Sequence, residues 1–222
     1  IVADELENNK ELQNEILKMD GLIVPQGWGS RGAEGKIKAI QIARENKIPY
    51  LGLCYGMQMA VIEFCRKVLG IKDANSEEID SKSKNLVIHL MENQKEILKH
   101  QNYGGTIRLG AWPCKIKKGS LLESLYKKYA NSLYSTLPVV MERHRHRYEF
   151  NTKYSSLLED SDMIISGESP NGKLVEAIEL DKKIHPFFVG TQYHPELKSR
   201  FLAPHPIFLG FINAAVKERN KN

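Results

Sequence analysis

The 222-residue sequence has only three cysteines, Cys54, Cys65 and Cys114, and no two of them form a CxxC pair. So few and so scattered, they argue against a disulfide framework and against a structural zinc site, and we expect no metal. A reducing, cytoplasmic location is the natural expectation. The chain also lacks any run of the roughly 20 apolar residues that a membrane-spanning helix needs. No signal-peptide pattern is visible, so we expect no membrane partner.

Charge of one sign is not concentrated along the chain either. Lysine and arginine outnumber aspartate and glutamate by 32 to 27, giving a net charge of +5, and the basic residues are scattered. The exception is the run RHRHR at 143–147. It is short and, Tyr148 apart, has no aromatic residues beside it, so we expect no nucleic-acid partner. The length and the 41% hydrophobic content fit one globular domain over 1–222.

Apolar runs alternate with amphipathic segments through the first third of the chain. Residues 22–24 and 48–53 are predicted strands, while 4–18, 33–47 and 57–70 have the apolar spacing of helices. Strand, helix, strand, helix predicts an α/β fold with a mostly parallel central sheet and helices on both faces.

The rest of the chain is less regular. We expect further strands at 85–91, 104–116, 173–180 and 186–194. Residues 120–138 mix helical and turn signals. A terminal helix over 205–218 is expected to pack through four residues: Phe208, Phe211, Ile212 and Val216.

Residues 52–56, GLCYG, place Cys54 between two glycines where a strand turns into a helix. This is the spacing of a nucleophile elbow, whose sharp turn exposes the central side chain at the carboxyl end of the sheet. The positive end of the following helix favours the thiolate, and its N–H groups can hold an oxyanion. The alternative is a small buried apolar residue. That interpretation fits Cys65 and Cys114, which have no glycine frame.

A thiolate needs a base, and His194 is the best placed of the seven histidines. It follows the expected strand at 186–194, Pro195 ends that strand, and the carboxylate of Glu196 comes two residues later. A histidine at the carboxyl end of a strand would share the sheet edge with Cys54, and Glu196 could hold its ring in one tautomer. Alone, His-Pro-Glu also fits a plain turn. The loop VPQGWG offers Gly27 as a second oxyanion donor, although glycine-rich turns are common.

Together these residues resemble a class I glutamine amidotransferase, with its flavodoxin-like fold. From about residue 15 onward the chain is similar to the glutaminase domains of CTP synthases, in segments 52–78, 104–116, 142–151, 191–200 and 204–215. The most specific of these are RHRHRYEFN and IRLGAWPCKI.

The resemblance implies a role for each matching residue. Cys54 would form a glutamyl thioester, His194 would serve as general base and acid, and Glu196 would orient it. The backbone N–H groups of Gly27 and Tyr55 would form the oxyanion hole. The substrate L-glutamine would be held by three side chains: Gln58, Glu78 and Arg147.

Two positions depart from the family pattern. Gln26 stands where the loop usually has glycine, and Tyr55 replaces the usual leucine after the nucleophile. Tyrosine there is similar to GMP synthase glutaminase domains. Three alternatives therefore stay open: another amidotransferase such as GMP synthase, a γ-glutamyl hydrolase, and a catalytically idle regulatory module.

The resemblance also implies what this chain lacks. The first strand and helix of the domain and the N-terminal amidoligase (synthetase) domain are expected to be absent. That synthetase domain would use ATP and Mg²⁺ to aminate UTP to CTP with the ammonia released here, under the effector GTP. The glutaminase domain itself would need no cofactor. Full-length enzymes of the family are homotetramers, whereas this chain alone is expected to be a monomer.

Overall fold

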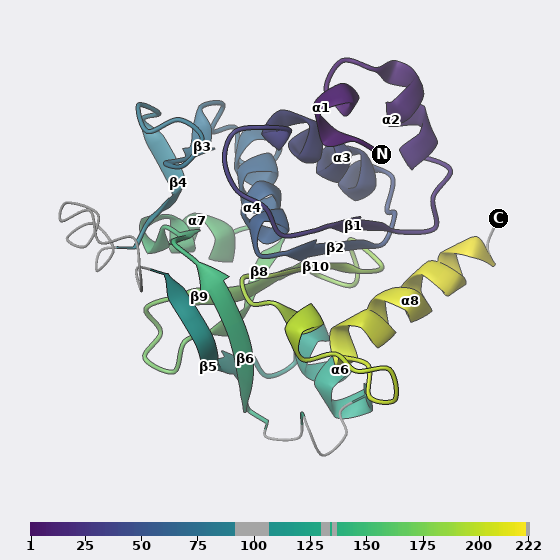
Figure 1. Ribbon diagram of the computed structural model, residues 1–222, viewed down its shortest axis with the longest axis vertical. Helices are drawn as coiled ribbons and strands as arrows, with labels where there is room; N and C mark the ends of the chain where they lie inside the picture. The colour runs from purple at the N-terminus through teal and green to yellow at the C-terminus, as the bar shows by residue number, and fades with distance from the viewer. Residues whose placement is uncertain (92–106, 130–133, 135–136, 221–222) are drawn as a thin grey trace.

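The computed structural model describes residues 1–91, 107–129, 134 and 137–220 (Figure 1). Its helices are α1 (Ala3–Leu6), α2 (Lys10–Ile16), α3 (Ala33–Glu45), α4 (Tyr55–Lys67), α6 (Leu121–Tyr129), α7 (Ser155–Glu159), α8 (Pro206–Arg219) and the 3-10 turns η1 (Thr152–Tyr154) and η2 (Pro195–Leu197). Its strands are β1 (Leu22–Val24), β2 (Tyr50–Leu53), β3 (Ala74–Ser76), β4 (Asn85–Leu90), β5 (Arg108–Ile116), β6 (Val139–His146), β7 (Tyr148–Phe150), β8 (Met163–Glu168), β9 (Val175–Leu180) and β10 (Phe188–Thr191).

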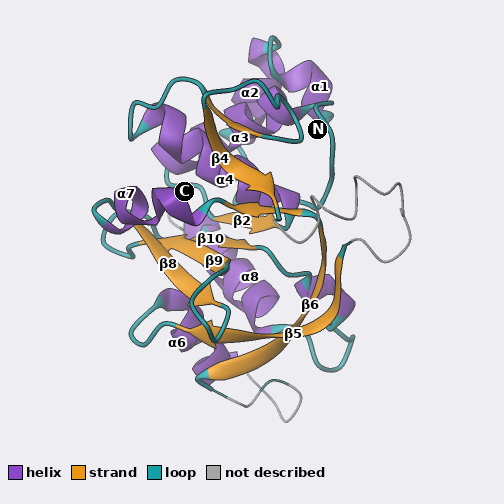
Figure 2. Ribbon diagram, turned by 90° about the vertical axis from the view of Figure 1, so that its left-hand side faces the viewer, coloured by secondary structure: helices purple, strands orange, loops and turns teal. Residues whose placement is uncertain are grey.

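Seven strands form one curled sheet (Figure 2), in the order β1-β2-β10-β9-β8-β5-β6, and β3, β4 and β7 form a second, smaller sheet. The predicted α/β class is confirmed. The expectation of a mostly parallel sheet was wrong, because only β1, β2 and β10 run parallel and the remaining four pairings are antiparallel. Strands β8, β9 and β10 are joined by short turns, which allow antiparallel pairing, whereas a parallel pair needs a long crossover.

The sheet is packed on both faces, as predicted. On β2 the side chain of Tyr50 belongs to the core under α3 and α4, and the next side chain, Leu51, belongs to the core over α6 and α8. The same alternation occurs on β10, where Phe188 and Val189 lie in these two cores. Figure 1 shows α3 and α4 on one side of the strands and α6 and α8 on the other. The period of two along each strand places neighbouring residues on opposite faces.

The expected N-terminal helix over 4–18 is two helices. Asn9 interrupts it, because its side-chain oxygen accepts hydrogen bonds from the N–H groups of Glu11 (3.0 Å) and Leu12 (3.2 Å) and so caps a new helix. The predicted strands at 22–24, 48–53, 85–91, 173–180 and 186–194 are confirmed within a few residues. The expected strand at 104–116 is β5 from Arg108, and its residues 104–106 lie outside the described residues, as do 130–133 and 135–136 of the mixed segment.

The terminal helix forms as predicted, but on a partly different face. Phe211 is buried (5% exposed), whereas Ile212 and Val216 are 56% and 51% exposed. The buried positions on α8 include Ile207 and Gly210 instead. A Cβ on Gly210 would clash with the Leu125 side chain, so α8 approaches α6 at this glycine, while Ile212 and Val216 lie on the solvent side of the helix.

Because Phe211 is buried and Ile212 is exposed, alanine substitutions at these neighbouring positions should have different effects on the free energy of unfolding. Replacing Phe211 with alanine is expected to lower the free energy of unfolding by about 3 kcal/mol, because it removes a buried ring. Replacing Ile212 with alanine should change it by less than about 0.5 kcal/mol, because that side chain is already half in water. Urea unfolding followed by circular dichroism measures both, and equal losses would contradict the packing described.

Candidate active site

Cys54 occupies a strained elbow between β2 and α4. Its backbone is at φ 51° and ψ −100°, and Lys47 is the only other described non-glycine residue with a positive φ. A Cβ on Gly56 would lie 2.1 Å from the Val24 carbonyl oxygen, and one on Gly52 would lie 2.6 Å from the Tyr50 hydroxyl. The predicted nucleophile elbow is therefore present, and both glycines allow close backbone packing.

The Cys54 thiol is buried and held in place. The backbone N–H of Cys54 donates to the Thr191 carbonyl over 2.6 Å, and the Gln192 side-chain amide donates to Cys54 Sγ over 3.5 Å. Burial raises the pKa of Cys54 to about 12, although the N–H of Tyr55 lowers it. The carboxylates of Glu196 and Glu78 raise it further. The helix terminus favours the thiolate in the predicted direction, through the Tyr55 N–H, but burial outweighs it and leaves the thiol protonated at neutral pH.

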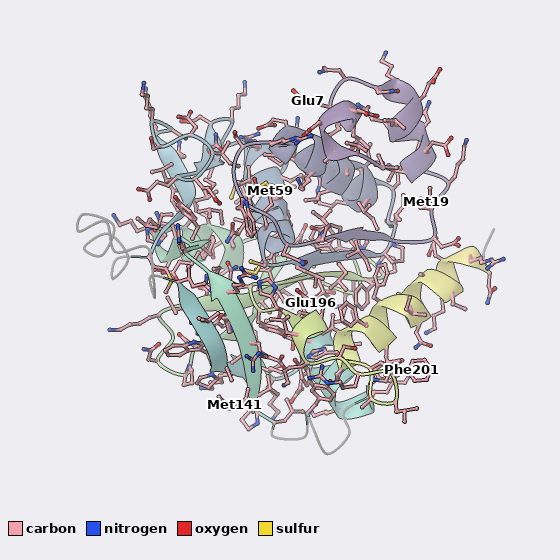
Figure 3. The ribbon with its side chains drawn as sticks, in the orientation of Figure 1. Glu7, Met19, Met59, Met141, Glu196 and Phe201 are labelled. Carbon is pink, nitrogen blue, oxygen red and sulfur yellow. The ribbon has the colours of Figure 1, made fainter. Side chains whose placement is uncertain are left out.

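His194 and Glu196 lie where the sequence predicts, at the carboxyl end of β10. Strands β10 and β2 are parallel neighbours with Thr191 opposite Leu53, so both end at the same sheet edge. His194 Nδ1 lies 2.6 Å from Glu196 Oε1, and Figure 3 shows Glu196 in the middle of the molecule. The other ring nitrogen, Nε2, is buried without a hydrogen-bond partner in the described structure. With Nδ1 as the donor to Glu196, Nε2 is left to accept a proton.

A cavity of about 400 Å³ opens at this edge. It is lined by Gly27, Trp28, Cys54, Gln58, Glu78, Ile107, Arg145, His146, Arg147 and Tyr148. Five of the eight predicted site residues therefore meet in it. The other three, Tyr55, His194 and Glu196, are not in its lining.

Gln58 is buried on α4 and is tied to a residue that sequence reasoning missed. Its side-chain nitrogen donates to the Tyr148 carbonyl (2.9 Å) and to the side-chain oxygen of Gln192 (3.2 Å), and within the described residues its own amide oxygen has no partner. Gln192 in turn donates to the thiol of Cys54. Its position two residues before His194 on a predicted strand was the available signal, since such residues share a face.

Glu78 and Arg147 bring opposite charges to the cavity. Glu78 Oε1 accepts a hydrogen bond from the Gly29 N–H over 3.0 Å. Burial raises the pKa of Glu78, while that hydrogen bond and the Arg147 charge lower it. A carboxylate and a guanidinium at one pocket suit a ligand with an ammonium and a carboxylate.

The basic run 143–147 is half buried. On β6 the side chains of His144 and His146 point inward, and those of Arg143 and Arg145 are exposed. His144 Nδ1 lies 3.0 Å from His146 Nε2, and burial with the nearby Arg108 charge lowers the pKa of His146 to about 3. The alternation is that of a strand with one face in the core and does not form a continuous basic patch.

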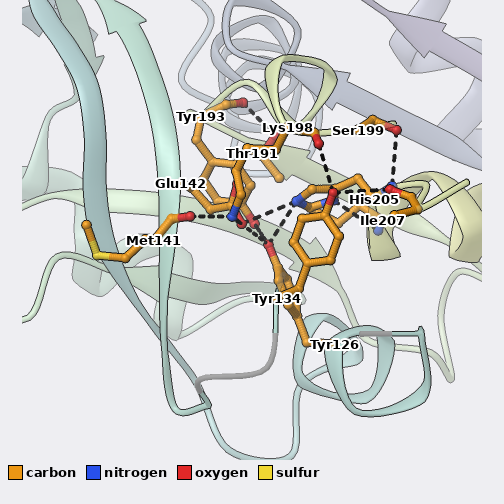
Figure 4. A network of polar contacts seen from close by, with 11 residues as sticks. Tyr126, Tyr134, Met141, Glu142, Thr191, Tyr193, Lys198, Ser199, His205 and Ile207 are labelled. Atoms are coloured by element: carbon orange, nitrogen blue, oxygen red, sulfur yellow. Dashed lines mark hydrogen bonds and ion pairs between the residues drawn. The ribbon is translucent and has the colours of Figure 1, made fainter. Parts of the chain in front are cut away.

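A buried network supports the turn that carries His194 and Glu196 (Figure 4). Glu142 Oε1 on β6 lies 3.0 Å from the Lys198 ammonium, 3.2 Å from His205 Nε2 and 2.9 Å from the Tyr126 hydroxyl. Burial alone would raise the pKa of Glu142, but His205 and Lys198 lower it below its ordinary value. This network joins β6, α6, η2 and the start of α8.

Three other features of the described residues bear on the sequence predictions. Gln26 is exposed and does not have a positive φ, so its position does not require the glycine usual in the family. The described residues contain no group of three or more histidine, cysteine, aspartate or glutamate side chains that could hold a metal ion. None of the described helices combines the length and apolar character needed to cross a membrane.

Comparisons with known proteins agree on one family. The family model described as glutamine amidotransferase class-I matches residues 3–214. The CTP synthase of Carboxydothermus hydrogenoformans is 50% identical over 97% of this chain, and that of Caldanaerobacter subterraneus subsp. tengcongensis is 53% identical over 96%. The chain spans only 38% and 37% of these two proteins.

A solved structure agrees with this result. The glutaminase domain of Trypanosoma brucei CTPS with bound acivicin is 39% identical, with a TM-score of 0.85, over 98% of this chain and 79% of that one. These matches favour the CTP synthase kind over the other amidotransferases considered from the sequence. The chain belongs to the class I glutamine amidotransferases and is a glutaminase domain of the CTP synthase kind.

Proposed function

We propose that this chain hydrolyses L-glutamine to glutamate and ammonia, with Cys54 as nucleophile, His194 as general base and acid, and Glu196 as the residue that orients His194. The observation that carries the proposal is the shared sheet edge. The elbow thiol and a histidine with one free ring nitrogen follow two adjacent parallel strands. Nucleophile, base and orienting carboxylate are the components of nucleophilic acyl transfer.

Substrate recognition follows from the charges at the cavity. Glu78 takes the α-ammonium of glutamine, and Arg147 takes its α-carboxylate with a forked pair of hydrogen bonds. The Gln58 amide oxygen, which has no partner within the described part of the chain, can accept a hydrogen bond from the substrate. The side-chain amide then extends toward Cys54, and the N–H groups of Tyr55 and Gly27 hold the oxyanion that develops on it.

Burial sets how the thiol is activated. Because the pKa of Cys54 is about 12, its proton moves to His194 Nε2 as the sulfur attacks the amide carbon. The tetrahedral intermediate collapses when His194 gives that proton to the leaving nitrogen, so ammonia departs and a glutamyl thioester remains. Water then attacks the thioester with His194 as base, and glutamate and the free thiol are released.

We further propose that residues 1–222 are one domain of a longer CTP synthase. In that enzyme the ammonia would be used for ATP-dependent amination of UTP to CTP by an N-terminal synthetase domain of the same polypeptide. ATP and Mg²⁺ would act in that domain, GTP would be the effector, and the glutaminase chemistry would need no cofactor. We propose a cytoplasmic homotetramer for the full enzyme, a monomer for this chain, and neither nucleic acid nor membrane as a partner.

The nucleophile can be tested by covalent labelling. Incubation with 6-diazo-5-oxo-L-norleucine, a glutamine-shaped electrophile, is expected to add one label to the chain at Cys54, identified by intact mass and peptide mapping. Cys54→Ala should remove the label and lower glutamine hydrolysis at least about 10³-fold while the circular dichroism spectrum is unchanged.

Cys65→Ala is the matched control, because Cys65 is a buried cysteine in the core of α4; it should keep the label. Hydrolysis retained in Cys54→Ala would overturn the assignment. A folded chain that takes no label would favour an idle module, and faster hydrolysis of γ-glutamyl peptides than of glutamine would favour a γ-glutamyl hydrolase.

The raised pKa of Cys54 predicts an unusual pH profile with a reagent that does not resemble glutamine. The thiolate fraction, and with it the rate of alkylation by iodoacetamide, should rise about tenfold per pH unit up to pH ~10 without levelling off. The same cysteine in urea should level off near its ordinary value of 9.0. A plateau below pH ~8 in the folded chain would contradict the burial argument.

The contact between His194 and Glu196 predicts a loss in turnover. Glu196→Gln keeps the shape but removes the charge that stabilises the imidazolium, so kcat should fall roughly 10²- to 10⁴-fold with little change in KM. Glutamate release from glutamine, measured at several concentrations, separates the two constants. A change confined to KM would place Glu196 in substrate binding instead.

A further inference from the structure

The peptide groups flanking Gly29 are held from two sides. The Gly29 N–H donates to Glu78 Oε1 over 3.0 Å, and the Gly29 carbonyl accepts from the Tyr55 hydroxyl over 2.5 Å. Glu78 follows β3 and Tyr55 begins α4, so two separate parts of the fold converge on one residue of the loop after β1. Gly29 itself has a φ of +73°, a backbone state that suits glycine. We call this arrangement the Gly29 clamp.

Tyr55 also lies against the residue that is proposed to supply an oxyanion donor. A Cβ on Gly27 would be 3.5 Å from the Tyr55 ring, so the ring packs directly against this part of the loop. The ring is almost fully buried (1% exposed), and the Lys36 ammonium lies 5.5 Å from its centre. Trp28, between the two glycines, is 74% exposed and makes no comparable anchor. The loop is therefore held by the two hydrogen bonds at Gly29 and by the Tyr55 ring packed against Gly27.

We propose that the Tyr55 side chain positions the oxyanion hole of this chain, by holding the loop that carries Gly27 through its hydroxyl bond to Gly29. This inference rests on the proposed function. Tyr55 then contributes twice, because its backbone N–H is one donor and its side chain fixes the segment that carries the other. A leucine, usual at this position in the family, offers packing but no hydrogen bond, so this tether is a specific property of the tyrosine.

The clamp also couples the loop to the substrate. Glu78 lines the cavity and holds the Gly29 N–H through one oxygen. A carboxylate has about four lone-pair sites, so Glu78 can accept from the Gly29 N–H and from the α-ammonium of glutamine at once. The Glu78 carboxylate would serve both the Gly29 N–H and the substrate ammonium, so its hold on the loop changes when glutamine binds. The Tyr55 hydroxyl bond to the Gly29 carbonyl does not involve the substrate. Its removal should therefore affect the reacting state more than binding.

Tyr55→Phe is the variant that tests this, because it keeps the buried ring and removes only the hydroxyl. With 6-diazo-5-oxo-L-norleucine we expect the maximal labelling rate of Cys54 (kinact) to fall about tenfold and the half-saturating concentration (KI) to change less than about twofold. Tyr154→Phe is the matched control. Its hydroxyl bonds to Asn85 at 3.1 Å, away from the cavity lining, and this variant should keep the unsubstituted rate.

Trp28 reports on the loop directly. The chain has two tryptophans, so Trp112→Phe leaves Trp28 as the only one. In this background we expect Tyr55→Phe to lower the fluorescence anisotropy of Trp28, because a loop with one tether lost moves more on the nanosecond timescale. Tyr154→Phe should not change it.

Variants of Glu78 test the second hydrogen bond of the Gly29 clamp and leave the residues of the elbow unchanged. Glu78→Gln keeps an acceptor oxygen for the Gly29 N–H and should leave the Trp28 anisotropy unchanged while raising KI roughly tenfold through the lost charge. Glu78→Ala should raise KI and also lower the anisotropy. These two variants keep the clamp testable if Tyr55→Phe does not fold.

The outcomes separate this inference from the proposed function. Failure of the unsubstituted chain to label at Cys54 would remove the proposed function and the oxyanion role together. Normal labelling with Tyr55→Phe equal to the unsubstituted chain in kinact and Trp28 anisotropy would overturn only the role of Tyr55. Iodoacetamide does not resemble glutamine. If Tyr55→Phe slowed its reaction with Cys54 as much as it slowed labelling by 6-diazo-5-oxo-L-norleucine, the role of Tyr55 would also be overturned, because the hydroxyl would then be controlling access to the thiol.

Discussion

The backbone at Cys54 is the constraint on which the site depends. A non-glycine residue at φ 51° costs on the order of 1–3 kcal/mol, and the surrounding structure must hold it there. Three contacts do so: the Cys54 N–H on the Thr191 carbonyl, the Tyr50 hydroxyl on the Gly56 carbonyl, and α4 packed onto β1 at Gly56. They come from the only three strands of the large sheet that run parallel. The parallel part of the sheet is therefore the part that builds the elbow, and the antiparallel strands extend the sheet beyond it.

Features set by short stretches of sequence could be predicted, and features set by tertiary contacts could not. The local spacing of Gly52 and Gly56 around Cys54 marks the elbow, and Pro195 marks the turn η2 that follows β10. Strand β6 was missed because three of its four buried residues, Glu142, His144 and His146, are polar, so the strand lacks the apolar alternation that marks a half-buried strand in sequence. The protonation state of Cys54 was out of reach for the same reason: the helix terminus that favours the thiolate is local, whereas the burial that raises the pKa of Cys54 comes from the whole fold.

Polar groups carry much of the specificity of this interior. Glu142 receives three donors on one oxygen: Tyr126 of α6, Lys198 just after η2 and His205 just before α8. Buried carboxylates with mismatched partners are costly, so such a site favours a single arrangement of β6, α6, η2 and α8. The turn bearing His194 and Glu196 is continuous with Lys198, so the network also ties this turn to β6. Apolar packing alone would tolerate small shifts of that turn.

The protonated, buried thiol also has a consequence for chemical durability. Peroxides and disulfides react with thiolates, and a cysteine whose pKa is about 12 presents almost none at neutral pH. At neutral pH the buried thiol therefore offers oxidants little thiolate, and in the proposed mechanism it reacts only once His194 takes its proton. The cysteines of redox sensors differ in both respects, because they are exposed and their low pKa keeps them as reactive thiolates. The burial that would make the proposed nucleophile depend on a base thus also limits the reaction of its thiol with oxidants.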